Sequence, residues 1–189
     1  MITGIIMASG FSRRMNKNKL TIKINGETII ERVIKAAKKS KLDELLVVYR
    51  TDEIKDIGLE YDIKPIFNPN AILGQSESVK LGVINSHKSS HYMFLVADQP
   101  FLDYRVIDRL IDAFNKEEKI TIPYFDGKFG MPLIFPNRFR KELLRTKGDK
   151  GGREIIRDNP MLVQRINFDN EKLGMDVDSP KDLTEGDIK

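Results

Sequence analysis

The 189-residue sequence predicts an α/β protein with a doubly wound, mostly parallel sheet in a three-layer α/β/α arrangement. Two observations carry this prediction. Continuous apolar runs at 2–7, 45–49 and 93–97 are typical of strands that are buried on both faces of a parallel sheet. Between these runs, apolar residues recur at helical spacing over 29–37 and 106–114, which indicates helices with one apolar face.

The remaining elements follow in order. We expect strands at 64–67, 120–123, 133–135 and 162–166, and helices at 75–86, 137–145 and 151–158. A turn is expected at 68–70, a hairpin turn at 126–128, and a helix start at Ser179-Pro180. Because strands and helices alternate, we expect a single domain over 1–189 with ligands bound at the carboxyl ends of the strands.

The amino-acid composition excludes several classes of function. The net charge of +4 is spread along the chain, so a nucleic-acid partner is the weaker interpretation. Cysteine is absent, which excludes thiolate metal sites and cysteine nucleophiles. His87 and His91 lie in a polar stretch and are expected to be surface residues. No apolar run approaches the length of a membrane span, so we expect a cytoplasmic protein without membrane contact.

The segment after the first strand combines small residues with cations. Ala8, Ser9 and Gly10 let the backbone approach a ligand closely, and Arg14 and Lys19 could neutralise phosphates. An ordinary glycine-containing turn with surface cations would have the same sequence. The segment matches neither the P-loop nor the dinucleotide-binding pattern.

Three later segments carry further polar groups. Gly74, Gln75 and Ser76 open a helix. Ser76 and Ser78 could cap this helix, or the glycine and the two hydroxyls could contact a nucleobase. Asp98 ends a buried strand, where it could bind Mg²⁺ or make a turn. Asp176 and Asp178 are two residues apart, so in an extended segment their side chains would lie on the same face. Phosphate-binding cations, small residues and carboxylates together suit phosphoryl or nucleotidyl transfer.

Six segments of the chain, in order, resemble the motifs of the molybdenum cofactor cytidylyltransferases of the MobA-like NTP transferase superfamily. These segments are MASGFSRRM at 7–15 with Lys19, GQSES at 74–78, DQP at 98–100, GMPLIF at 130–135, GDKGGR at 148–153 and DVDSPKDL at 176–183. The resemblance spans nearly the whole chain and implies the Rossmann-like nucleotidyltransferase fold. It also implies a reaction in which CMP passes from CTP to molybdenum-bound molybdopterin and pyrophosphate is released.

The resemblance assigns roles residue by residue. Ala8, Ser9, Gly10, Gly74, Gln75 and Ser76 would bind the nucleoside. Arg14 and Lys19 would hold the triphosphate and, with Asp98, act in catalysis. Asp98 and Asp178 would bind Mg²⁺, with Asp176 as the less favoured carboxylate. Residues 1–100 would form the nucleotide-binding half and 101–189 the pterin half, in which the substrate would meet Gly130, Pro132, Asp149, Lys150 and Arg153.

Ser9 stands where the cytidylyl branch has alanine and the guanylyl branch has glycine. Its side chain takes up room, which favours the smaller pyrimidine. Met131 replaces a histidine that is common in the family, so an imidazole is not expected on the pterin side. The alternatives are a guanylyltransferase for the same cofactor, another nucleotidyltransferase of the superfamily, and a chaperone that binds the cofactor for a recipient molybdoenzyme.

Overall fold

The sheet that the sequence predicts is present in a computed structural model, which describes residues 1–11, 18–178 and 182. Its central path runs in the order β10 (Val163–Phe168), β7 (Ile120–Phe125), β9 (Leu133–Phe135), β6 (His91–Val96), β1 (Ile2–Ala8), β4 (Glu44–Tyr49) and β5 (Lys64–Phe67). A short eighth strand, β8 (Lys128–Phe129), pairs with β7. The α/β class and the mostly parallel sheet are thereby confirmed.

Strand direction places the loops of interest on one edge of the sheet. β9 is antiparallel to both β6 and β7, whereas the pairs β1–β4, β1–β6, β4–β5 and β7–β10 are parallel. Six strands therefore point the same way. Because the carboxyl ends of parallel strands meet at one edge, the segments that follow β1, β5 and β6 meet there.

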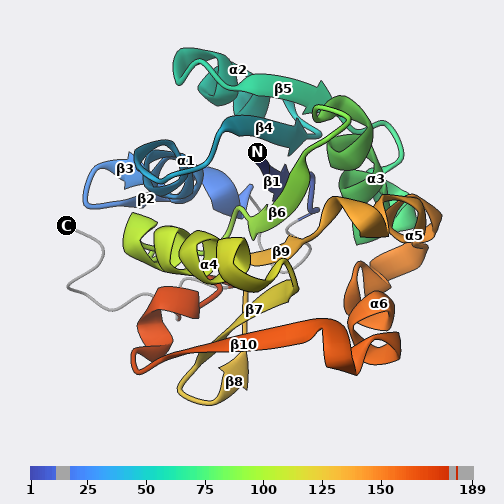
Figure 1. Ribbon diagram of the computed structural model, residues 1–189. Coiled ribbons are helices and arrows are strands. Elements are labelled where there is room, and N and C mark those ends of the chain that lie inside the picture. Colours follow the sequence, from blue (N-terminus) through green and yellow to red (C-terminus); the bar gives the residue numbers. More distant parts are fainter. Residues whose placement is uncertain (12–17, 179–181, 183–189) are drawn as a thin grey trace.

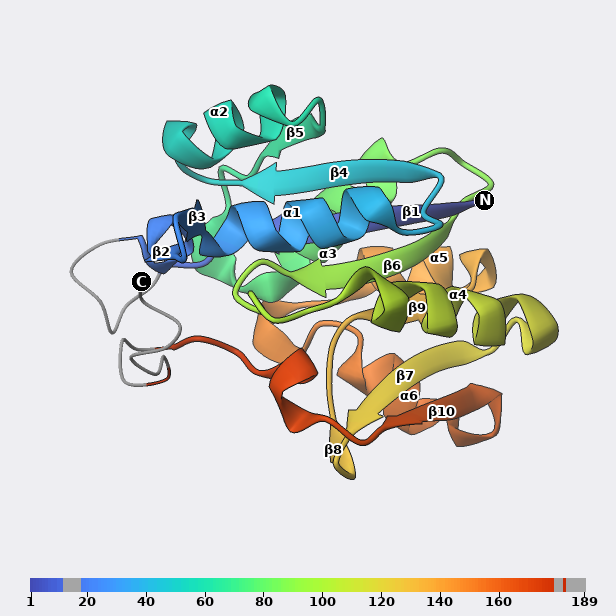
Figure 2. The same ribbon diagram turned by 90° about the vertical axis from the view of Figure 1, so that its left-hand side faces the viewer.

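Helices cover both faces of the sheet (Figures 1 and 2). The helices α1 (Ile29–Lys39), α2 (Asp52–Glu60) and α4 (Tyr104–Glu117) share one apolar cluster with the sheet. The helices α3 (Gln75–Asn85), α5 (Arg140–Arg145) and α6 (Arg153–Asp158) share the other cluster. Figure 1 shows α1 and α4 on the left of the sheet and α3, α5 and α6 on the right, which gives the three layers.

The alternation of side chains along β1 explains why both layers are needed. Ile2 and Ile6 pack toward α1 and α4, and Ile5 between them packs toward α3. All three are almost completely buried. A strand with two apolar faces is stable only when helices exclude water from each face.

Helix α1 begins where the sequence predicts, because Thr28 closes a capping box with Glu31. The Thr28 side chain accepts from the backbone N–H of Glu31, and the Glu31 carboxylate accepts from the N–H of Thr28. The remaining secondary-structure elements of the described residues are short. They are the hairpin of β2 (Lys23–Ile24) and β3 (Glu27–Thr28), and the 3₁₀ segments η1 (Lys19–Thr21), η2 (Ala71–Leu73), η3 (Asn137–Phe139), η4 (Gly148–Lys150), η5 (Pro160–Leu162) and η6 (Glu171–Gly174).

Several details differ from the sequence-based expectations. Helix α2 was not predicted, because only two of its residues, Ile54 and Gly58, are buried and its apolar pattern is weak. His91 does not lie in a surface loop. It begins β6 and its half-buried ring packs edge-on against Phe114 at a centroid distance of 4.8 Å. The helix start expected at Ser179-Pro180 lies outside the described residues. In the part of the chain that the structure describes, no helix has the length and apolarity needed to cross a bilayer.

Candidate active site

A pocket of about 370 Å³ opens at the edge where β1 and β6 end. Its walls come from the segment after β1, from η1, from the approach to α3 and from the end of β6. The glycines and polar residues that line it are Ser9, Gly10, Lys19, Gly74, Gln75, Ser78, Asp98 and Asp149. The pocket therefore gathers residues that lie far apart in the sequence.

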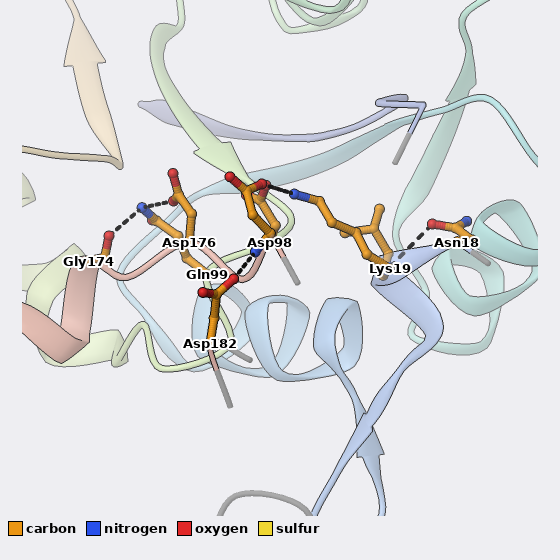
Figure 3. A network of polar contacts seen from close by, with 9 residues as sticks. Asn18, Lys19, Asp98, Gln99, Gly174, Asp176 and Asp182 are labelled. Atoms are coloured by element: carbon orange, nitrogen blue, oxygen red, sulfur yellow. Dashed lines mark hydrogen bonds and ion pairs between the residues drawn. The ribbon is translucent and has the colours of Figure 1, made fainter. Parts of the chain in front are cut away.

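Lys19 is held between two carboxylates in this pocket. Figure 3 shows its contact with one of them, Asp98. Its Nζ donates to Asp98 Oδ2 at 2.6 Å and to Asp178 Oδ1 at 3.0 Å. The Lys19 side chain is only 15% exposed. Burial alone would lower the pKa of Lys19, but attraction to Asp98 and Asp178 outweighs burial and raises that pKa above its ordinary value. The ammonium group is therefore firmly charged.

The backbone brings the third aspartate to the same place. The N–H of Val177 donates to the carbonyl of Asp98 at 2.9 Å, which fixes residues 176–178 beside the end of β6. Gln99 then donates from Nε2 to Asp176 Oδ1 at 2.9 Å and to the carbonyl of Gly174 at 3.0 Å (Figure 3). Loss of hydration and the nearby charge of Asp98 raise the pKa of Asp176 above its ordinary value.

The floor of the pocket is a buried hydrogen-bonded triangle. Ser9 Oγ and Ser78 Oγ lie 2.6 Å apart, and Asn68 Nδ2 donates to both hydroxyls at 3.0 and 3.2 Å. The orientation of the Asn68 amide is fixed, because its Oδ1 accepts from the N–H of Asn70 at 3.1 Å. Asn68 is 1% exposed. The two serines line the pocket, and Asn68 holds them from behind.

A second pocket of about 250 Å³ lies against the first one. The two share four lining residues, which are Met7, Gln75, Val96 and Asp98. The second pocket is rich in apolar side chains and carries charged groups at Arg153 and Asp176. Its apolar residues are Val79, Phe94, Phe129, Met131, Leu133 and Phe135, in addition to the shared ones. Two ligands could therefore meet at Asp98.

One part of the wall of the first pocket depends on a glycine. Gly74 has φ = +106°, and a Cβ there would lie 2.5 Å from the carbonyl carbon of Gly148. Asp149 follows Gly148, and its Oδ1 accepts from the N–H of Gln75 at 3.1 Å. The segment at 148–149 can lie this close to the start of α3 only because residue 74 has no side chain.

The structure places the sequence-predicted residues as follows. Ser9, Gly10, Lys19, Gly74, Gln75, Asp98 and Asp149 line the first pocket, Arg153 lines the second, and Asp178 contacts Lys19. Ala8, Ser76, Gly130 and Pro132 line neither pocket. Ala8 packs into the core beneath α1, and Ser76 is fully buried. Arg14 lies outside the described residues, and so does the side chain of Lys150.

Sequence reasoning missed Asn68 altogether. Asn68 follows the end of β5, so a search of the segments after each strand could have found it, but it reads as a turn residue. Ser78 was considered only as a helix cap or a base contact. Met7 and Met131 were noted only as members of the family's motifs, and neither was assigned a contact. Only their places in the fold bring them to the pockets.

The donor set fits a divalent metal ion with oxygen ligands. Asp98 and Asp178 converge on one position from distant parts of the chain, and that position already accommodates a positive charge. Mg²⁺ is commonly held by one or two carboxylates, with water and substrate phosphates as its other ligands. Among the described residues, no group of three or more acidic, histidine or cysteine side chains forms a metal cage. Two carboxylates and a phosphate-bearing ligand would complete such a site.

Comparison with known proteins gives relatives of similar length. The purine catabolism protein PucB of Bacillus subtilis (strain 168) is 30% identical over 194 residues, which cover 96% of this chain and 93% of PucB. The nicotine blue oxidoreductase of Paenarthrobacter nicotinovorans is 23% identical over 193 residues, with 96% and 94% covered. A probable molybdenum cofactor guanylyltransferase of Clostridium perfringens (strain 13 / Type A) is 30% identical over 161 residues, with 84% and 74% covered.

Solved structures share the fold. A nucleotidyl transferase from Methanothermobacter superposes with a TM-score of 0.82 at 19% identity, covering 96% of this chain and 94% of its own. The complex of Rv0371c from Mycobacterium tuberculosis H37Rv with manganese superposes with a TM-score of 0.80 at 20% identity, with 96% and 95% covered. The family model described as the MobA-like NTP transferase domain matches residues 4–165. The chain therefore belongs to the MobA-like NTP transferase domain family and is a nucleotidyltransferase.

Proposed function

We propose that this protein transfers CMP from CTP to the terminal phosphate of molybdenum-bound molybdopterin, giving the cytosine dinucleotide cofactor and pyrophosphate. The observation that carries the proposal is the shared wall of the two pockets, in which Asp98 belongs to both. A transferase must hold its donor and its acceptor in contact at the reacting phosphorus. A shared wall that includes a carboxylate suits this requirement.

The second pocket supports a flat acceptor that carries an anionic group. Phe129 supplies exposed aromatic surface, whereas Phe94 and Phe135 are almost completely buried, and Arg153 supplies a cation. Guanidinium groups bind phosphate through two parallel hydrogen bonds. We therefore assign the acceptor to the second pocket and the nucleotide to the first. In this assignment residues 1–100 contribute most of the nucleotide site, and residues 101–189 contribute much of the acceptor site.

The first pocket supports a nucleoside triphosphate. Ser9 and Ser78 present hydroxyls to the sugar or base, and Arg14 and Lys19 would hold the triphosphate. The Ser9 side chain narrows the pocket and favours cytosine. A second candidate is GTP, because the relative from Clostridium perfringens bears the name of a guanylyltransferase.

The reaction needs positioning and charge neutralisation more than proton transfer. An oxygen of the acceptor phosphate attacks the α-phosphorus, and the bond from that phosphorus to the bridging oxygen breaks. Pyrophosphate leaves with the bonding electrons. The attacking phosphate is already ionised near neutral pH, so no general base is required. Lys19 and Arg14 would stabilise the charge that develops on the leaving group.

Asp98 and Asp178 would hold Mg²⁺, which supplies further neutralisation of the α- and β-phosphates when it is bound. A protein that shares this fold, Rv0371c, was solved in complex with manganese, which supports a divalent ion as a ligand. Asp98 would also help to position the acceptor phosphate against the nucleotide, because its carboxylate borders both pockets.

The direct test is an activity assay with purified protein, molybdenum-bound molybdopterin and each of the four nucleoside triphosphates. We expect pyrophosphate release and dinucleotide formation to be fastest with CTP. Faster turnover with GTP would support the guanylyl alternative. No turnover with any nucleotide, from folded protein and an acceptor that a known transferase accepts, would contradict the proposal.

We predict that Asp98→Ala lowers the rate of nucleotidyl transfer by at least about 10²–10³-fold, the usual cost of losing one contact that stabilises transition-state charge. Asp112→Ala is the matched control, because Asp112 is also an aspartate paired with a lysine but borders neither of the two pockets. Both variants should keep the circular dichroism spectrum of the wild type. An Asp98→Ala protein with wild-type turnover at saturating Mg²⁺ would remove Asp98 from the mechanism.

A further inference from the structure

Lys19 occupies the position that the proposed metal ion would take. Its ammonium lies 2.6 Å from Asp98 Oδ2 and 3.0 Å from Asp178 Oδ1, the two carboxylates proposed as metal ligands. The partners are separated by 79 and 159 residues in the sequence, so the contact is a product of the fold. Figure 3 shows Lys19 extended toward the end of β6, where Asp98 lies.

Lysine and a divalent metal ion cannot share this position. Mg²⁺ binds carboxylate oxygens at about 2.0–2.1 Å, so it would sit where the Lys19 ammonium now lies. Two cations a few ångströms apart also repel each other strongly in a partly buried site. The Lys19 and Asp98 side chains are only 15% and 21% exposed, whereas Asp178 is 53% exposed, so water screens that repulsion only in part. A metal ion must therefore displace Lys19 before it can bind both carboxylates.

A nucleoside triphosphate is the ligand suited to draw Lys19 away. Lys19 and Asp98 line the same pocket, and the small residues Ser9 and Gly10 border it. The backbone at Lys19 is anchored, because Asn18 Oδ1 accepts from the N–H of Leu20 at 3.2 Å. Only the flexible side chain has to swing from the carboxylates to the phosphates.

We propose that Lys19 is a displaceable internal counter-ion, which keeps divalent metal ions out of the Asp98–Asp178 site until a nucleoside triphosphate binds. This inference rests on the proposed function for the identity of the nucleotide. It adds an order of events, in which nucleotide and metal enter together and the metal alone binds weakly. The coupling free energy between nucleotide binding and metal binding is then the free-energy cost of moving Lys19 away from Asp98 and Asp178.

The first test measures Mn²⁺ binding by electron paramagnetic resonance in the absence of nucleotide. We expect Lys19→Met to bind Mn²⁺ about tenfold more tightly than the wild type, or more, because the ammonium no longer competes with the metal for the carboxylates. Lys23→Met is the matched control, since it removes the same charge from an exposed position four residues away and should leave the affinity unchanged. Equal Mn²⁺ affinity in Lys19→Met and the wild type would overturn the inference, and so would an equal gain in Lys23→Met.

A second measurement needs no variant and so does not depend on the folding of Lys19→Met. The rate at which acetic anhydride acylates Lys19 in the wild type is read from peptide masses, with Lys23 as the internal standard. At Mn²⁺ concentrations that fill the site, the rate for Lys19 should rise several-fold relative to Lys23, because Lys19 has left its carboxylates. A rate that Mn²⁺ does not change would mean that Lys19 is not displaced.

The outcomes separate this inference from the proposed function. Tighter Mn²⁺ binding in Lys19→Met, together with no turnover of any nucleotide in the wild type, would support the counter-ion role and reject the transferase reaction. Normal turnover in the wild type, together with unchanged Mn²⁺ affinity in Lys19→Met, would support the transferase reaction and reject the counter-ion role.

Discussion

Asn68 shows how much of the pocket depends on one buried side chain. Its amide donates to Ser9 and Ser78 and accepts from the backbone of Asn70, so it ties the ends of β1 and β5 to α3. We predict that Asn68→Ala lowers the free energy of unfolding by about 1–3 kcal/mol, because it leaves buried polar groups without partners. Urea unfolding measures the change.

Asn70→Ala is the control for that measurement. Asn70 is exposed, and its side chain makes no capping hydrogen bond, so the change should stay within about 0.5 kcal/mol. The backbone N–H that Asn68 accepts from remains in this variant. Similar losses in the two variants would mean that the buried triangle contributes nothing special to stability.

Helix α4 depends on its first residues in a way that pH can reveal. Asp103 is the N-cap, and its Oδ1 accepts from the N–H of Arg105 at 2.8 Å. Hydrogen bonds from the Arg105 side chain and backbone lower the pKa of Asp103 to about 2. The folded-state pKa lies below the ordinary 3.8, so the stability that Asp103 contributes is present above pH 3.8 and is lost as the pH falls toward 2.

We predict that Asp103→Ala destabilises the protein by about 1 kcal/mol near neutral pH, the usual cost of removing an N-cap. Asp103→Asn keeps a capping oxygen but cannot titrate. Its unfolding free energy should therefore fall less steeply than that of the wild type as the pH drops from 3.8 toward 2, as followed by urea unfolding at several pH values. Parallel pH profiles for Asp103→Asn and the wild type would show that this carboxylate does not govern acid stability.

In the molecule as a whole, Gly74 joins parts of the chain that are distant in sequence. The η4 segment lies against the start of α3, and the two pockets share Gln75 in this region. We predict that Gly74→Ala costs about 1–3 kcal/mol of stability through its backbone strain alone. It should also slow nucleotidyl transfer, because the new methyl group pushes residues 148–149 away.

Gly127→Ala controls for backbone strain. Gly127 also has positive φ, at +75°, but a Cβ there would meet nothing within 4 Å. This variant should lose about 1–2 kcal/mol of stability and keep its transfer rate. Hydrogen exchange at 148–151 should quicken only in Gly74→Ala. If both variants slow transfer equally, a steric role for residue 74 in the pocket wall is ruled out.

Local patterns in the sequence were enough to predict the class of fold and the edge of the sheet where the candidate site lies. Apolar runs and helical spacing involve only neighbouring residues, so they predicted the buried strands and the helices α1, α3 and α4. The carboxyl-end rule then led to Ser9, Gly74 and Asp98, because strand direction follows from the alternation of elements. Helix α2 escaped prediction, since it buries only Ile54 and Gly58.

The family resemblance had placed Asp98 and Asp178 on one metal ion, but the direct contacts between side chains could be read only from the packed molecule. Ser76 and Ser78 are two positions apart, so they point to different sides of α3, and only helix packing determines that Ser78 faces the pocket. The contact of Lys19 with Asp98 and Asp178 joins segments that no local pattern relates. Short-range spacing specifies elements, whereas contacts across the sheet depend on how those elements pack, and the chemistry of this site belongs to the second kind.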